Sequence, residues 1–280
     1  MNAAKIVARL VLAWIALVAA QMLAGMLVPV HIPVVPSVFL WMLVADAAVV
    51  LAMGSAALRS DWRGWKLAAA LFAVPAVVTI ANMVEGAIFL SELHIDWRGI
   101  TTVTVLGYAI AAILWMIVFR GPIAETPVGS WAFPERSLGQ KILRFLACVV
   151  SYVFLYYLAG TIIFPFVRDF YAGIGVPPVR VIVPLQLLFR GPLFVLLCLL
   201  LLRMFRLPRW SGALAVGLSF TLVSGIAALI IPNPYFPDSV RWVHFGEVTS
   251  SNFVFGCIVG WVWGSAGTAR AAARLTPQPV

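Results

Sequence analysis

Eight long apolar stretches, separated by short polar or proline-containing segments, dominate this sequence. Each stretch is 20–24 residues long, and about 20 apolar residues suffice to cross the hydrocarbon core of a bilayer as a helix. They are Leu10–Pro29, Val38–Leu58, Leu67–Leu90, Ile100–Phe119, Phe145–Phe166, Val181–Leu202, Gly212–Ile231 and Trp242–Trp263. Only 10% of the chain is charged, whereas a soluble domain is about 25% charged. We therefore predict an all-α polytopic membrane protein with eight transmembrane helices, and we exclude a soluble enzyme.

The first apolar stretch has a second interpretation. Lys5 and Arg9 followed by an apolar run also resemble a secretory signal peptide, with small residues at Ala19 and Ala20 for cleavage. The run continues to Val30, however, beyond the apolar region of about 7–15 residues that is typical of signal peptides. We expect the stretch to be retained. Cleavage would leave seven spans and an external amino terminus.

Basic residues are distributed unevenly over the segments that join these spans. If the amino terminus is cytoplasmic, 14 of the 19 basic residues fall in inner segments, namely Lys5, Arg9, Arg59, Arg63, Lys66, Arg120, Arg136, Lys141, Arg144, Arg203, Arg206, Arg209, Arg270 and Arg274. Lys and Arg are enriched in cytoplasmic loops, so we place both termini in the cytoplasm and the protein in the bacterial cytoplasmic (inner) membrane. The net charge of +9 is then expected to meet anionic lipids, and we exclude nucleic acid as a partner.

Two four-span halves are suggested by a weak internal similarity. Arg9–Gly25 aligns with Arg144–Gly160 at an offset of 135 with five identities in 17 positions, and a shorter match follows Arg59 and Arg206 at an offset of 147. Repeats with an even number of spans would be parallel, related by an axis along the membrane normal. We therefore hypothesise repeats over residues 1–120 and 141–270, joined by a cytoplasmic linker at 121–140. Shared apolar composition explains the matches equally well.

Two opposite charges are expected at similar depths near the middle of the membrane. Asp46 lies 10 residues after Pro36, and Arg190 lies 9 residues into the sixth span, which at 1.5 Å per residue is roughly 15 and 13 Å deep. Gln186 lies one turn before Arg190, and Pro192 should open the helix beside it. Charges at this depth mark binding sites or structural pairs. We predict an ion pair between Asp46 and Arg190, which is either a structural pair or part of a solute path.

A second group of polar residues is expected in the outer half of the bundle. Glu85 and Glu247 each lie five residues from the outer end of a span, roughly 8 Å below the boundary. The candidate outer site consists of Asn82, Glu85, His94, His244, Glu247 and Ser251. Glu85, His94, His244 and Glu247 have the chemistry to bind a divalent metal or to relay protons. The alternative for His244 and Glu247 is a solvated helix end capped by Asp238 or Ser239.

The remaining sequence features exclude several chemistries. Cys148, Cys198 and Cys257 lie singly inside apolar spans, a pattern that favours buried small hydrophobic residues over disulfides or a zinc site. The sequence has no Walker loop, HExxH motif or GxSxG nucleophile elbow. Three classes of function remain. They are transport of an ion, proton or small solute, a non-catalytic membrane scaffold or sensor, and a membrane-embedded, metal-dependent enzyme that acts on a lipid-type substrate.

Overall fold

The computed structural model describes residues 2–30, 36–120, 135–233 and 235–264, and these form helices and connecting turns without a strand. In chain order the helices are α1 (Ala3–Leu27), α2 (Pro36–Arg59), α3 (Gly64–Phe89), α4 (Trp97–Val118), α5 (Leu138–Ile174), α6 (Val179–Pro184), η1 (Leu185–Arg190), α7 (Gly191–Phe205), α8 (Arg209–Thr221), η2 (Leu222–Ile226), α9 (Ala227–Leu229) and α10 (Asp238–Trp263). The all-helical class expected from the sequence is therefore confirmed for these residues.

Seven helical segments are long and apolar enough to cross a membrane. The α6–η1–α7 run forms one of them, from Val179 to Phe205, and the α8–η2–α9 run forms another, from Arg209 to Leu229. Helix α10 was expected as the eighth span. It has 26 residues, but its first half carries charged and polar side chains around Glu247, so it does not reach the apolarity of the other seven. The protein is multi-pass, and the eight-span topology stays a prediction.

Helix α5 is much longer than its apolar stretch predicts. It has 37 residues, equivalent to roughly 55 Å at 1.5 Å per residue, whereas the hydrocarbon core is about 30 Å thick. A capping box between Ser137 and Gln140 starts the helix before the apolar run begins. Gly175, at a φ of +81°, ends it. The local capping signals therefore extend α5 at both ends of the apolar run Phe145–Phe166.

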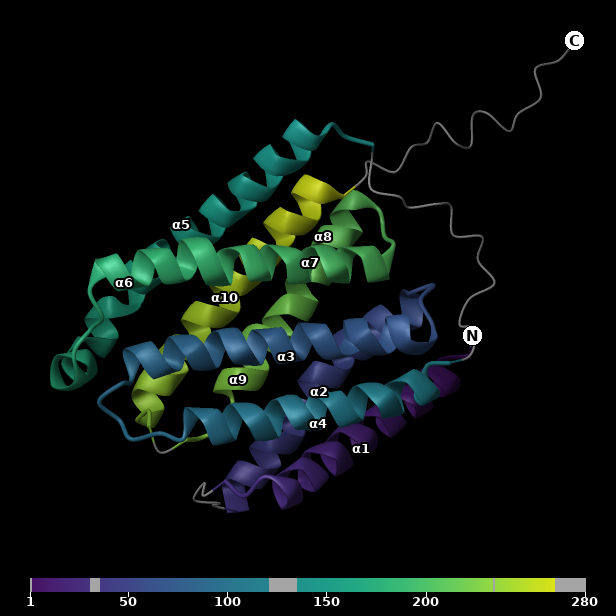
Figure 1. Cartoon of the computed structure of the whole chain (residues 1–280), viewed down its shortest axis with the longest axis horizontal. Helices are drawn as coiled ribbons and strands as arrows, with labels where there is room; N and C mark the ends of the chain where they lie inside the picture. Colours follow the sequence, from purple (N-terminus) through teal and green to yellow (C-terminus); the bar gives the residue numbers. More distant parts are fainter. Residues whose placement is uncertain (1, 31–35, 121–134, 234, 265–280) are drawn as a thin grey trace, which may run out of the picture.

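The helices form two groups with the same order of neighbours (Figure 1). In the first group, α4 packs against α1 and α3, and α2 packs against α1. In the second group, α10 packs against α5 and α8, and α7 packs against α5 and α8. Helices α2 and α3 of the first group contact α7, η1 and η2 of the second. This boundary between the groups is where the polar side chains described below gather.

Small residues bring α8 and α10 into the closest approach of the second group. A Cβ atom built at Gly256 would lie 2.8 Å from Cα of Gly217, and one built at Gly260 would lie 2.6 Å from Cα of Ala213. Gly256 and Gly260 have the four-residue spacing that lets membrane helices approach backbone to backbone. This close contact holds α10 against α8 and η2. It thereby places the polar first half of α10 beside the rest of the bundle.

One end of the bundle carries the basic helix ends. This end of the bundle holds the start of α1, the α2–α3 turn, the end of α4, the start of α5, the α7–α8 turn and the end of α10 (Figure 1). Here Arg206 at the end of α7 pairs with Asp61 before α3 at 2.8 Å. The gathering of basic helix ends at one end of the bundle agrees with the alternation of inner and outer loops that the charge pattern predicts.

Candidate functional site

Two short π-helical segments interrupt the helices at the boundary between the groups. In η1, Gly191 donates its backbone N–H to the carbonyl of Gln186, and in η2, Ala227 donates to Leu222. The sequence predicted an opening of the helix at Gly191–Pro192. The structure has a π-helical turn there instead, because the wider turn accommodates a proline that has no N–H to donate. π-helical turns occur frequently at functional sites.

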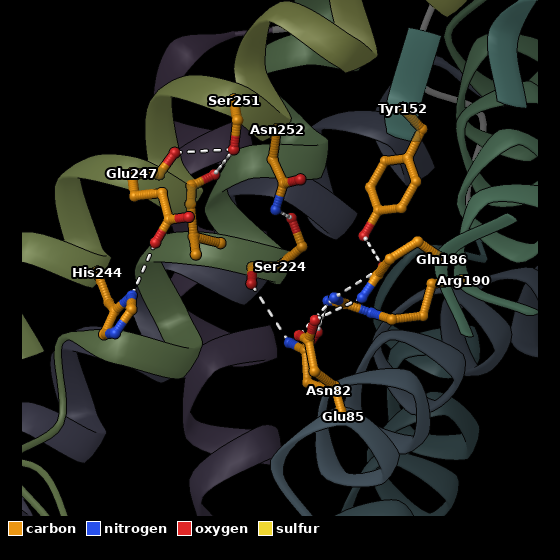
Figure 2. A network of polar contacts seen from close by, with 11 residues as sticks. Asn82, Glu85, Tyr152, Gln186, Arg190, Ser224, His244, Glu247, Ser251 and Asn252 are labelled. Atoms are coloured by element: carbon orange, nitrogen blue, oxygen red, sulfur yellow. Dashed lines mark hydrogen bonds and ion pairs between the residues drawn. The ribbon is translucent and has the colours of Figure 1, made fainter. Parts of the chain in front are cut away.

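Arg190, at the end of η1, is the centre of a buried polar network that joins the two helix groups (Figure 2). Its guanidinium forms an ion pair with Glu85 of α3, donates to Oδ1 of Asn82 at 2.9 Å and contacts Oε1 of Gln186 at 3.4 Å. The Arg190 side chain is 5% exposed and that of Glu85 is 21% exposed. An ion pair this deeply buried requires the hydrogen bonds of its neighbours to offset desolvation.

Neutral polar side chains extend this network in both directions. Gln186 donates from Nε2 to Glu85 at 2.8 Å and accepts from the hydroxyl of Tyr152 at 3.2 Å. On the other side, Asn82 donates to the backbone carbonyl of Ser224 in η2, whose hydroxyl accepts from Asn252 of α10 at 2.9 Å. We call the seven residues Asn82, Glu85, Tyr152, Gln186, Arg190, Ser224 and Asn252 the interface network. It draws on α3, α5, η1, η2 and α10.

The predicted ion pair between Asp46 and Arg190 is wrong. Arg190 pairs with Glu85, and Asp46, which is buried in α2, accepts a hydrogen bond from Gln21 of α1 at 2.9 Å. The depth estimate placed both charges near the middle of the membrane but gave no direction around each helix axis. In the structure Asp46 points into the first helix group towards α1, and Arg190 points across the boundary towards α3.

A second polar cluster lies on the first half of α10. Glu247 accepts from Nδ1 of His244 at 2.7 Å, and Nε2 of His244 forms a hydrogen bond with the hydroxyl of Tyr171 in α5 at 2.9 Å. Because a carboxylate contacts Nδ1, this nitrogen carries a proton, and in the neutral imidazole Nε2 accepts from Tyr171. We call His244 and Glu247 the His–Glu pair. Its one-turn spacing was expected, but its tyrosine partner was not.

The His–Glu pair is not a solvated helix cap. The side chains of His244 and Glu247 are only 15% and 12% exposed. Helix α10 begins at Asp238 after Pro237 and has no side-chain cap, while Asp238 pairs with Arg241 at 2.8 Å. The alternative in which Asp238 or Ser239 caps this helix is therefore wrong, because Pro237 occupies the N-cap position and the carboxylate of Asp238 pairs with Arg241.

The two clusters lie close to each other but remain separate. Both clusters contact α5, since Tyr152 donates to Gln186 of the interface network and Tyr171 forms a hydrogen bond with His244 of the His–Glu pair. Among the described residues, however, no hydrogen bond or ion pair joins the interface network to the His–Glu pair (Figure 2). Ser251, expected in the outer site, donates its hydroxyl to the backbone carbonyl of Glu247 at 2.8 Å and so belongs to the second cluster.

The predicted metal site is not assembled in the described part of the chain. No group of three or more His, Cys, Asp or Glu side chains there has an arrangement that could hold a metal ion. Glu85 is engaged by Arg190 and Gln186, and Glu247 is engaged by His244. His94 lies in the turn between α3 and α4, and sequence spacing alone could not show that it stays apart from the other three. Cys148, Cys198 and Cys257 are free thiols.

One buried donor of the interface network has no partner among the described residues. Nε of Arg190 is enclosed and forms no hydrogen bond, and the same is true of the Tyr157 hydroxyl in α5 and the Thr249 hydroxyl in α10. Unsatisfied buried polar groups are rare in folded proteins. Nε of Arg190 therefore retains hydrogen-bonding capacity inside the interface network.

Comparison of the chain with family models, with curated proteins and with solved structures found no match.

Proposed function

We propose that this multi-pass membrane protein transports a small polar solute or an ion, including protons, and that the site lies between its two helix groups. The observation that carries the proposal is the ion pair of Arg190 with Glu85, which connects η1 of one group to α3 of the other. Transporters built from two groups of helices bind their substrates at the interface of the groups, near broken helices. The π-helical turns η1 and η2 supply such interruptions.

The charge and hydrogen-bonding capacity of the interface network support this proposal. Arg190 keeps an unpaired Nε, and Glu85 is the more exposed member of the pair. A solute that accepts from Arg190 or donates to Glu85 would compete with the ion pair. Removing one partner of a buried pair costs about 3–5 kcal/mol, so binding of such a solute would weaken the contact that holds the two groups together. Binding and relative movement of the groups are coupled in this way.

The His–Glu pair supports protons as the transported or coupled ion. A histidine ring can accept a proton on one nitrogen and release one from the other, and His244 is placed between the carboxylate of Glu247 and the hydroxyl of Tyr171. These groups can accept a proton and pass it on through hydrogen bonds. Gly160 of α5 faces the carboxylate, since a Cβ built there would lie 3.7 Å from Oε1 of Glu247. No larger side chain covers Glu247 at that position.

Proton movement can be measured with the purified protein in vesicles that contain a pH-sensitive dye, with a potassium gradient and valinomycin to set the potential. We expect faster acidification than in protein-free vesicles. Glu247→Gln should abolish the difference, because the amide cannot accept the proton. Glu92→Gln, at an exposed glutamate in the α3–α4 turn, is the matched control and should behave as the unmodified protein. Equal rates with and without protein would overturn the proton-transport proposal.

A second candidate is a membrane-embedded enzyme that acts on a lipid-type substrate, and it rests on the same His–Glu pair. A histidine oriented by a carboxylate serves as a general base in many enzymes. If the vesicle assay shows no proton movement, the lipids of cells with and without His244→Ala should be compared by mass spectrometry. Accumulation of one lipid class in the variant would favour the enzyme. No change in either assay would leave transport of another ion or solute through the interface network and the scaffold or sensor, in which the polar residues only pack the bundle.

We further propose that the basic end of the bundle faces the cytoplasm of a bacterial inner membrane. The 14 basic residues assigned to inner segments support this orientation through the positive-inside rule. With this orientation both termini are cytoplasmic, and anionic lipids surround the basic helix ends.

A further inference from the structure

Three arginines converge on the carboxyl end of α10, at the basic end of the bundle. Nη1 of Arg144 in α5 donates to the backbone carbonyl of Val262. Nη1 of Arg136, just before α5, lies 3.4 Å from the carbonyl of Trp263, and Nε of Arg209, the first residue of α8, donates to that of Gly264 at 3.2 Å. We call Arg136, Arg144 and Arg209 the arginine cluster. Three separate points in the sequence supply it.

The positive charge of this cluster exceeds what the helix end needs. The carboxyl end of a helix carries the equivalent of about −0.5 elementary charge, and the three guanidinium groups bring three positive charges. Among the described residues, none of the three arginines pairs with an acidic side chain. The ion pair found at this end of the described bundle is that of Arg206 with Asp61. Partial burial, together with the charges of Arg144 and Arg209, lowers the pKa of Arg136. Within the described ranges, therefore, no acidic side chain balances the positive charge of the cluster.

The arginine cluster also has unused donors. Each guanidinium has five N–H donors, and each member of the cluster donates one hydrogen bond among the described residues. The planar guanidinium fork matches the oxygen atoms of a phosphate group, to which it binds through two parallel hydrogen bonds. A phosphate between these arginines would balance the charge and accept from the remaining donors.

Exposed tryptophans beside the cluster indicate that the phosphate belongs to a lipid. The ring of Trp261 lies 5.4 Å from the guanidinium of Arg209 and 6.2 Å from the ring of Trp210. These two tryptophans are 45% and 72% exposed. Tryptophan rings of membrane proteins gather at the level of the lipid headgroups, and basic pockets between helices bind anionic headgroups on the cytoplasmic side. Free phosphate would use the arginines but gain nothing from the tryptophans.

We propose that the arginine cluster, together with Trp210 and Trp261, is a binding site for the phosphate headgroup of an anionic phospholipid. The site is formed by the start of α5, the start of α8 and the end of α10. It lies at the basic end of the bundle, away from the interface network and the His–Glu pair, and does not depend on what the protein transports. A lipid bound there would hold α5, α8 and α10 together at one end.

The test uses the purified full-length chain in a neutral detergent, titrated with short-chain phosphatidylglycerol, phosphatidylcholine or inorganic phosphate, with binding measured by the shift of the thermal unfolding midpoint. We expect a saturable rise with phosphatidylglycerol and none with phosphatidylcholine. Arg136→Gln should weaken the response about tenfold, since one charge-assisted contact is lost. Arg136 precedes the first residue of α5, so this variant should fold. Arg98→Gln, near the start of α4 at the other end of the bundle, is the matched control.

Three results would overturn the proposal. The first is an equal response to phosphatidylcholine, which would show that headgroup charge plays no part. The second is an equal response to inorganic phosphate, which would show a phosphate site without a lipid. The third is an unchanged affinity in Arg136→Gln when its unfolding midpoint without lipid matches that of Arg98→Gln. Trp210→Ala separates the contributions further, because it should weaken the lipid response and leave any response to inorganic phosphate unchanged.

Discussion

Replacing Glu85 with glutamine should destabilise the protein strongly, because it leaves Arg190 charged and buried. The Arg190 side chain is 5% exposed, and loss of one partner from a buried ion pair costs about 3–5 kcal/mol. Glu85 itself is 21% exposed, and Arg190 keeps its hydrogen bonds to Asn82 and Gln186. We therefore expect the lower end of that range, about 3 kcal/mol. This equals roughly a 100-fold change in the ratio of folded to unfolded protein.

The measurement is a double-mutant cycle in mixed micelles, with unfolding followed during titration with a denaturing detergent. Glu85→Gln and Arg190→Gln are made singly and together. Since the double variant leaves no buried charge unpaired, its loss should be smaller than the sum of the single losses by at least about 1 kcal/mol. A second cycle with Asp46→Asn and Arg190→Gln should be additive within about 0.5 kcal/mol, as expected for residues that do not interact.

Two outcomes would refute this reasoning. Additive losses for Glu85 and Arg190 would show that the ion pair does not hold the two helix groups together. Coupling between Asp46 and Arg190 would restore the pairing that the depth estimate predicted. The single variant Asp46→Asn supplies the matched control, since asparagine can still accept from Gln21, the partner that Asp46 has in the structure.

Three further predictions follow from the packing and the topology. Gly256→Ala should destabilise the protein by about 1–3 kcal/mol through overpacking, because its Cβ would lie 2.8 Å from the backbone of α8. Gly246→Ala, with open space around it, should be neutral or stabilising by up to about 1 kcal/mol. Chemical unfolding of both variants checks this. His244→Ala should abolish proton movement in vesicles and also lower the unfolding midpoint, because it leaves the carboxylate of Glu247, which is 12% exposed, without its partner; proton movement at the unmodified rate in the folded variant would exclude His244 from the proton path. Reporter fusions after Tyr235 should read as external and fusions after Val280 as internal, and an external carboxy terminus would contradict the eight-span topology.

Much of the fold could be predicted from the sequence because hydrophobic stretches report directly on length and burial. The seven confirmed apolar helices coincide with predicted stretches, with differences at the ends. The largest difference is in α5, where the capping box at Ser137 and the glycine at 175 decide the length rather than hydrophobicity. The count of eight spans stays a prediction, because the polar residues of the candidate site on α10 lower the apolarity of that helix.

The candidate site was predicted only in its parts. Asn82 and Glu85 were predicted in the outer site, and Gln186 and Arg190 in a separate ion-pair site near the middle of the membrane. The structure instead brings these four together. Tyr152, Tyr171, Ser224 and Asn252 were missed. Tyrosine and serine are too common inside apolar stretches to stand out in a sequence. Their place in the site is visible only from the hydrogen bonds that the structure shows, such as those of Tyr152 with Gln186 and of Tyr171 with His244. The duplication into two halves stays a prediction.

The sequence by itself determined that this chain folds into apolar helices long enough to span a membrane, and that His244 and Glu247 share one face of a helix. Those properties depend on composition, on the 1.5 Å rise per residue and on the one-turn spacing. Only the tertiary structure decided which charges meet. Pairing depends on the order of helices around the bundle and on the rotation of each helix about its axis, and these are set by contacts such as Gly256 against Gly217. Because such contacts join residues far apart in the chain, Arg190 pairs with Glu85 across the boundary between the helix groups, and Asp46 remains with Gln21 inside one of them.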